Sequence, residues 1–285
     1  GHLQVRAGGG LELAGGGAAR SAALSAEGGA LRVGSPFVAG DGLTLMGQTG
    51  VTSDVLSAGG GLDIAAGAGN IVTGSLVALG PVRVAGSGTV TVRGPVVSDG
   101  AVTLNAGAGL GVEGALASGG AATLLGEGVR VDGAVVAQGV LTADAGTAAL
   151  ALAGELRSGA GVVLGGRQVS TSGILTGGTI EVRAGTGGFE NPGRLVGNAG
   201  VNVASLGDVQ QQGGVASQGN VSLMAGRDMS LSGDVEAGGR LGLGAAERIL
   251  ATGAWRSAGT REATAGRSID VVGEVLGGRY VDMKA

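Results

Sequence analysis

The sequence predicts an all-β protein, a parallel β-helix (solenoid) of about 14 coils, with about 19–20 residues and three short strands per coil. Three observations predict this fold class. A glycine-bounded phrase returns at a nearly constant spacing, apolar and polar residues alternate within each repeat, and aromatic residues make up only 1% of the chain. A core with so few rings must be narrow and filled by Val, Leu, Ile and Ala.

The repeat is marked by a phrase of one glycine, any residue, Val or Leu, a few mostly small residues and a closing glycine. Examples are "GSLVALG" (74–80), "GALASGG" (114–120) and "GDVEAGG" (233–239). The closing glycine opens the next repeat, and looser copies cover residues 1–41. The openings are Gly42, Gly61, Gly80, Gly100, Gly120, Gly139, Gly161, Gly178, Gly200, Gly219, Gly239, Gly259 and Gly278.

Within each repeat the apolar residues occupy every second position. In residues 100–120 they are Val102, Leu104, Leu110, Val112 and Leu116, and in residues 219–239 they are Val221, Leu223, Met229, Leu231 and Val235. A period of two is typical of strands and not of helices. Three strands with such short corners predict one coil in which each strand pairs with its counterpart in the next coil, about 4.8 Å away.

Residues 1–285 are expected to form a single β-helical repeat segment cut from a longer chain. The spacing between Gly139, Gly161, Gly178 and Gly200 is 22, 17 and 22 residues, which predicts irregular, longer coils around 139–200. The stretch "GTGGFENPGRL" (185–195) interrupts the strand rhythm. It is expected to bulge outward as a surface loop, either a tolerated insertion or a binding loop.

Composition narrows the possible functions. The net charge of −4 lacks the basic excess that is typical of nucleic-acid binding, so we expect no nucleic-acid partner. The chain has no cysteine, so its stability must come from elsewhere than disulfides. No apolar run approaches the roughly 18 residues of a spanning helix, and four aromatic residues (Phe 2, Trp 1, Tyr 1) would form no interfacial girdle, so we expect no membrane insertion.

Three stretches resemble the haemagglutinin repeats of the filamentous haemagglutinin family: "GNVSLMAGRDMSLSGDVEAGGRLGLGA" (219–245), "GGLDIAAGAGNIVTGSLVALG" (60–80) and "GAVTLNAGAGLGVEGALASGG" (100–120). These bacterial exoproteins are exported by two-partner secretion. The resemblance implies a right-handed parallel β-helix, a location outside the cell or at the bacterial surface, and a role in adhesion and virulence. It also implies an outer-membrane transporter as export partner and host-cell surface glycans or receptors as ligands.

The most economical interpretation is a structural shaft segment of an adhesin, which is not an enzyme. One alternative is the stalk of a contact-dependent growth-inhibition exoprotein, which uses similar repeats. A second alternative is a β-helical enzyme acting on polysaccharides, which would need acidic groups gathered on one face. The acids are scattered instead. Asp234 and Glu236 project together, and Asp234 and Glu274 share a position two coils apart. We expect no catalytic site, no metal site and no cofactor.

Arginines near the carboxyl end form a second candidate binding surface. Arg227 and Arg267 follow an "AG" corner and Arg248 lies beside one, while Arg261 lies nearby. A basic ridge of this kind would bind heparin or other sulfated glycans, with strong salt dependence. The alternative is a soluble edge of mixed charge, because Asp228 and Glu247 lie within the ridge. The glycan-binding candidates are Arg227, Arg248, Arg267, Arg240 and Arg256.

Overall fold

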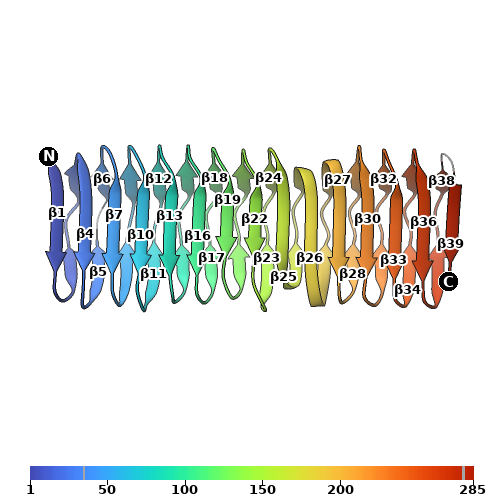
Figure 1. The fold of residues 1–285 in the computed structure, drawn as a ribbon, viewed down its shortest axis with the longest axis horizontal. Coiled ribbons are helices and arrows are strands. Elements are labelled where there is room, and N and C mark those ends of the chain that lie inside the picture. Colours follow the sequence, from blue (N-terminus) through green and yellow to red (C-terminus); the bar gives the residue numbers. More distant parts are fainter. Residues whose placement is uncertain (35, 278–279) are drawn as a thin grey trace. The chain divides into compact units, whose positions relative to one another are not determined.

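The computed structural model describes residues 1–34, 36–277 and 280–285. The described residues form strands and no helix, and the strands stack in parallel as a β-solenoid of about 14 coils (Figure 1). This confirms the predicted fold class. The chain comprises two compact units, Gly1–Thr142 and Ala143–Ala285. The repeat opening predicted at Gly278 lies outside the described residues.

In unit 1 each coil contributes one strand to each of three parallel stacks. The first stack contains β1 (His2–Ala7), β4 (Ser21–Ala26), β7 (Leu43–Gly47), β10 (Leu62–Ala66), β13 (Val82–Gly86), β16 (Val102–Ala106) and β19 (Ala122–Leu125). The second contains β2 (Leu11–Leu13), β5 (Ala30–Val33), β8 (Gly50–Ser53), β11 (Asn70–Thr73), β14 (Val90–Val92), β17 (Leu110–Val112) and β20 (Val129–Val131). The third contains β3 (Gly17–Ala19), β6 (Phe37–Ala39), β9 (Leu56–Ala58), β12 (Leu76–Ala78), β15 (Val96–Ser98), β18 (Leu116–Ser118) and β21 (Val135–Ala137).

Unit 2 also has three parallel stacks, but three long strands contribute to more than one of them. These strands are β25 (Gly161–Thr171), β26 (Leu175–Asn191) and β27 (Leu195–Ser205). The first stack continues with β30 (Asn220–Ala225), β33 (Leu241–Ala245), β36 (Thr260–Ala265) and β39 (Tyr280–Lys284). The second includes β23 (Ala149–Leu152), β28 (Val209–Gln211), β31 (Met229–Leu231), β34 (Arg248–Ala251) and β37 (Ser268–Val271). The third includes β24 (Leu156–Ser158), β29 (Val215–Ser217), β32 (Val235–Ala237), β35 (Trp255–Ser257) and β38 (Val275–Gly277). The chain passes from unit 1 to unit 2 within β22 (Leu141–Asp144).

The core is a set of aliphatic ladders, because the pairing register superposes the buried residue of one coil on that of the next. In the first stack of unit 1, Val84 pairs with Leu104, and Leu104 pairs with Leu124. All three side chains are buried. The apolar residues predicted to face inward in 100–120 and 219–239 are buried without exception. The two-residue period therefore predicted the core correctly.

Glycine at the corners is required where one coil closely approaches the backbone of the coil before it. At Gly69, a Cβ atom would lie 1.7 Å from the carbonyl oxygen of Thr49. No side chain can occupy that space without moving the preceding corner. The glycine phrase thus reflects close stacking of corners as well as the turns themselves.

The predicted surface loop at 185–195 is wrong. Most of this stretch belongs to β26, and Phe189 is buried between its partners Val169 and Val209 in the second stack. Its ring is apolar and takes an ordinary position in the ladder, so burial is more favourable than protrusion. The extra length lies in β26 at a corner. Gly166 and Gln168 of β25 are two residues apart, whereas their partners Ala184 and Gly188 in β26 are four residues apart, so the pairing shifts register there.

Among the described residues, no helix is long and apolar enough to cross a membrane.

Candidate binding surfaces of the second unit

A groove crosses the outer surface of the first stack in unit 2. Its floor is the backbone of β33, because both outward-facing positions of that strand, Gly242 and Gly244, lack a side chain. The neighbouring strands carry side chains at the paired positions, Ser222 and Met224 on β30 and Glu262 and Thr264 on β36. The hollow has a volume of about 650 Å³. Two ladder steps separate its walls, a distance of about 10 Å.

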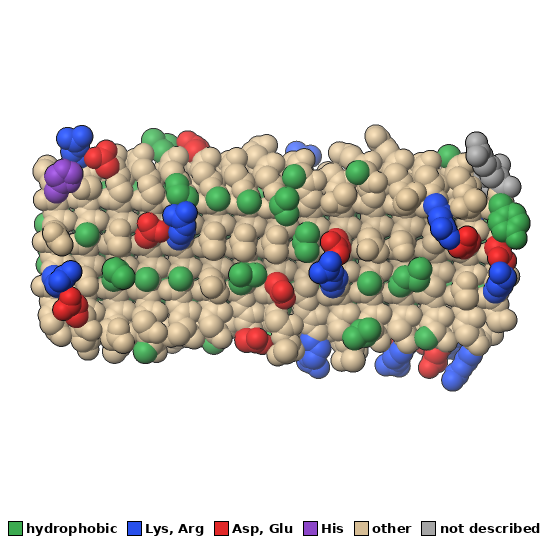
Figure 2. All heavy atoms as spheres, in the orientation of Figure 1, with side chains coloured by type: hydrophobic (Ala, Val, Ile, Leu, Met, Phe, Trp, Pro, Cys, Tyr) green, Lys and Arg blue, Asp and Glu red, His purple; other side chains and the backbone are tan. Residues whose placement is uncertain are grey.

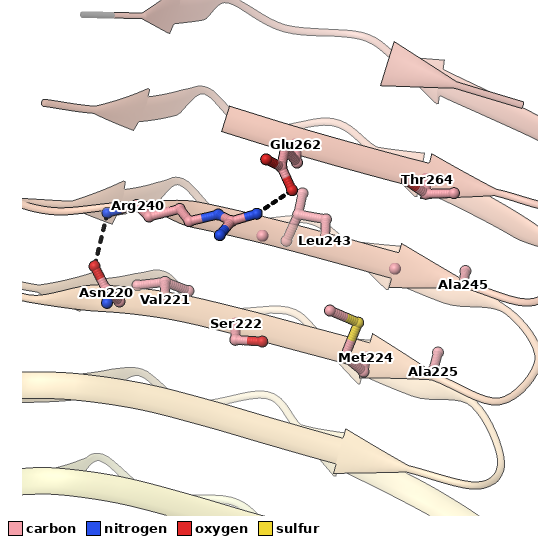
Figure 3. Close-up of a pocket in the computed structure, with 12 residues that line it drawn as sticks. Asn220, Val221, Ser222, Met224, Ala225, Arg240, Leu243, Ala245, Glu262 and Thr264 are labelled. Atoms are coloured by element: carbon pink, nitrogen blue, oxygen red, sulfur yellow. Dashed lines mark hydrogen bonds and ion pairs between the residues drawn. The ribbon is translucent and has the colours of Figure 1, made fainter. Parts of the chain in front are cut away.

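One end of the groove is polar. Arg240 extends along β33 toward Glu262 and forms an ion pair with it (Figure 3). The backbone N–H of Arg240 donates a hydrogen bond of 2.8 Å to Oδ1 of Asn220. The side chains of Arg240 and Glu262 are 56% and 47% exposed, so both can reach a ligand from solvent. An exposed pair of this kind is worth at most about 1 kcal/mol and is easily exchanged for ligand contacts.

The other end of the groove is apolar. The sulfur of Met224 lies over Gly244, 2.5 Å from where a Cβ would stand. By contrast, a Cβ at Gly242 would meet no atom within 4 Å. The groove therefore offers hydrogen-bonding groups at one end, a flexible thioether at the other and an open centre between them.

Analysis of the sequence identified Arg240 but missed the groove around it. The signal was present in "RLGLGA" (240–245), where glycine occupies both outward positions of a strand. Corresponding strands carry at least one larger side chain there, such as Thr103 and Asn105 in β16. Alternation predicts which residues of a strand face inward, but it does not by itself mark a strand whose outward positions are both glycine.

The predicted arginine ridge is a ladder of ion pairs at the corner between the first and second stacks. Each arginine pairs with an acid of the preceding coil, and the three pairs interlock along the chain. The N–O distances are 3.6 Å for Arg227–Asp208, 3.0 Å for Arg248–Asp228 and 3.4 Å for Arg267–Glu247. Three acids therefore balance three bases, and this arrangement favours the interpretation as an edge of mixed charge. On the face shown in Figure 2, most basic side chains likewise lie beside acidic ones.

The Arg248–Asp228 pair is the best-formed member of this ladder. Nε and Nη2 of Arg248 donate hydrogen bonds of 3.2 and 3.0 Å to the two carboxylate oxygens of Asp228. This bidentate contact lowers the pKa of Asp228 and raises the pKa of Arg248. The corner thus holds its carboxylate in the charged form.

The other arginines of the predicted region lie elsewhere. Arg256 is on the outer surface of the third stack, where it pairs with Asp234 at 3.4 Å and Glu236 at 3.2 Å. Arg261 was expected to add to the ridge, but it is only 3% exposed and occupies an inward position of β36. The strand alternation requires this placement, because Arg261 pairs with the buried Leu241.

The structure also places the acids that a polysaccharide-acting enzyme would need. Asp234 and Glu236 project together as predicted, and Arg256 binds both. Among the residues that the structure describes, no group of three or more His, Cys, Asp or Glu side chains could hold a metal ion.

Comparison of the chain with protein-family models, curated proteins and solved structures yields no match. The resemblance to the filamentous haemagglutinin family therefore stays a prediction from the sequence.

Proposed function

We propose that the chain is a structural shaft segment of a secreted bacterial surface adhesin, and that the groove over β33 is a contact point for host-cell glycans or receptors. In this proposal the role of the stacked coils is mechanical, because they hold a binding surface in place. The proposal involves no catalytic centre. The proposal includes export of the chain through an outer-membrane transporter of the two-partner-secretion type.

The observation that supports the proposal best is the uniformity of the coils. Parallel pairing continues from strand to strand within each unit, and most of the inward positions are aliphatic. Such repetition provides a long surface, and the stability of each coil depends mainly on its contacts with the neighbouring coils. The groove interrupts this uniformity, and its Arg240, Asn220 and Glu262 provide donors and acceptors that suit the hydroxyl groups of an extended sugar chain.

A bead-adhesion assay tests the proposal. Beads coated with the 285-residue protein are expected to bind cultured epithelial cells and not bacterial cells, whereas the stalk of a toxin-delivery protein would favour bacteria. Binding to epithelial cells no stronger than that of albumin-coated beads would overturn the adhesin proposal.

Two matched variants separate the groove from the rest of the surface. Gly242→Leu fills the groove, and Gly111→Leu adds the same side chain to an outward position of β17 in unit 1. Neither added Cβ meets an atom within 4 Å, so both variants are expected to fold. We expect Gly242→Leu to reduce adhesion about tenfold, equivalent to the roughly 1.4 kcal/mol of one good contact, and Gly111→Leu to leave it unchanged. Equal adhesion by both variants would remove the groove from the proposal.

A further inference from the structure

The outer side of the third stack in unit 1 is an apolar surface without charge at its centre. From β6 to β21 each strand has one outward residue, and β6, β12 and β18 mark the course of the stack in Figure 1. These outward residues are Val38, Ser57, Val77, Val97, Ala117 and Val136. The four valines are 37–48% exposed. The residues that lead into the same strands are Pro36, Val55, Ser75, Pro95, Ala115 and Ala134. Together these residues form the valine face, and none of them is ionisable.

The fold itself does not require this absence of charge. In unit 1 the first stack has Asp63 and Arg83 at outward positions. In unit 2 the third stack has charges at its outward and leading positions, which include Glu155, Arg157, Arg194, Asp234, Glu236 and Arg256. The uncharged surface is therefore particular to the valine face, and a contiguous exposed apolar patch is typical of an interaction site.

The corners that border the valine face have an excess of acid. They carry Asp54, Glu113, Asp132 and Arg93 on one side, and Asp41 and Asp99 on the other. Asp41 pairs with Arg20 of the preceding coil, and Asp132 pairs with Arg130 of β20. Among the described residues, Asp54, Asp99 and Glu113 have no ion-pair partner. A second copy of the valine face would bring the same acidic border, whereas a basic partner would complement it.

The dimensions of the valine face match those of a helix. Each inner strand pairs with a strand on both sides, so the stack offers no free edge to an added strand. Five ladder steps separate β6 from β21, a distance of about 24 Å, and a strand of three residues is about 10 Å long. A helix of about 16 residues has this length, and with its side chains it has a diameter of about 10 Å.

We propose that the valine face is a docking site for a basic amphipathic helix of a partner protein. The apolar side of that helix covers the valines, and its lysines or arginines lie beside Asp54, Asp99 and Glu113. Burial of aliphatic surface provides the affinity, and the charges orient the helix. The site lies in unit 1 and is independent of the groove over β33 and of the adhesin proposal.

A labelled peptide serves as the probe. It has about 16 residues, with leucines at helical spacing on one side and lysines beside them. Fluorescence anisotropy measures its binding to the 285-residue protein, and saturable binding is expected. Two control peptides have glutamate in place of lysine, or the same composition with the leucines distributed around the helix. Each control is expected to bind at least about tenfold more weakly than the lysine peptide.

Two matched variants test whether the peptide binds at the valine face. Val77→Ser/Val97→Ser removes apolar groups from its centre, and Ser57 shows that serine fits an outward position of this stack. Val72→Ser/Val196→Ser makes the same change at half-buried outward positions of β11 and β27, outside the valine face. We expect the first variant to weaken binding about tenfold and the second to leave it unchanged. Urea unfolding checks that both variants fold.

A third variant tests the acidic border. Asp54→Asn/Asp99→Asn/Glu113→Gln is expected to weaken binding and to reduce its dependence on salt. The proposal is overturned if the native protein shows no saturable binding, if both valine variants bind the lysine peptide equally, or if the glutamate peptide binds as tightly as the lysine peptide. It is also overturned if the protein dimerises in sedimentation experiments and Val77→Ser/Val97→Ser restores the monomer, because a second copy then covers the valine face.

Discussion

Buried polar residues close one corner of unit 2. Thr171, Asn191 and Gln211 occupy the last inward position of the second stack in three successive coils, and each is at most 2% exposed. Nδ2 of Asn191 donates to the carbonyl oxygen of Gly193 and to Oε1 of Gln211, at 3.1 and 3.0 Å. The amide stack therefore satisfies corner carbonyls that aliphatic side chains would leave without donors.

Replacement of one member should have a measurable cost. We expect Asn191→Ala to lower the free energy of unfolding of unit 2 by about 1–3 kcal/mol, because Oε1 of Gln211 and the N–H of Gly193 lose a buried partner. Urea unfolding measures the change. Glu190→Gln, an exposed position on the same strand, is the control and should have little effect. If Asn191→Ala lowers the free energy of unfolding no more than Glu190→Gln does, the amide stack does not stabilise the corner.

The ion-pair ladder gives a prediction for pH. Arg248 lowers the pKa of Asp228 in the folded protein. The ordinary value of an unfolded aspartate is about 3.9. The stability from this pair is therefore present above about pH 4 and is lost as the pH falls through the lowered folded value. NMR titration of the Asp228 carboxyl carbon should show a midpoint below that of the Arg248→Ala variant. Identical midpoints in the native protein and in Arg248→Ala would show that Arg248 does not lower the pKa of Asp228.

At the scale of the coil, the sequence predicted more about the interior than about the surface. The inward residues of β16–β18 and β30–β32 follow directly from the alternation, since one face of each strand must be buried. The alternation did not predict the strand at 185–195, because glycine and proline in "GTGGFENPGRL" resemble a loop, while the decisive contacts of Phe189 and Asn191 are with neighbouring coils. Nor did it predict the pairing of Arg227, Arg248 and Arg267 with acids one coil earlier, since those distances depend on register.

Corner glycines provide a test at this scale. We expect Gly69→Ala to destabilise unit 1 by about 1–3 kcal/mol, since its Cβ would lie 1.7 Å from the Thr49 carbonyl oxygen and the corner would have to move. Gly111→Ala is the matched substitution in the same unit, where no atom lies within 4 Å of the added Cβ. It is expected to be neutral or slightly stabilising, because it restricts the unfolded chain. Urea denaturation of both variants measures the difference, and equal stabilities would show that corner stacking is not the reason for the glycine.

For the whole molecule, the account depends on parallel, in-register stacking within each unit. The outward residues of the third stack of unit 1 follow one another in successive coils, from Val38 through Ser57, Val77, Val97 and Ala117 to Val136. Such a stack predicts stability that is largely nearest-neighbour in character. It also fixes the separation between any two coils as a multiple of one strand spacing.

Electron–electron distances between spin labels measure that spacing most directly, and the absence of native cysteine allows clean labelling at chosen pairs. Cysteine pairs are introduced at Val38 with Val97, Val38 with Ala117 and Val38 with Val136, which are three, four and five coils apart. The stacked coils predict narrow distributions whose centres increase by about 4.8 Å from each pair to the next. Unequal steps, or a distance that falls as the coils become more distant in sequence, would contradict the parallel β-helix.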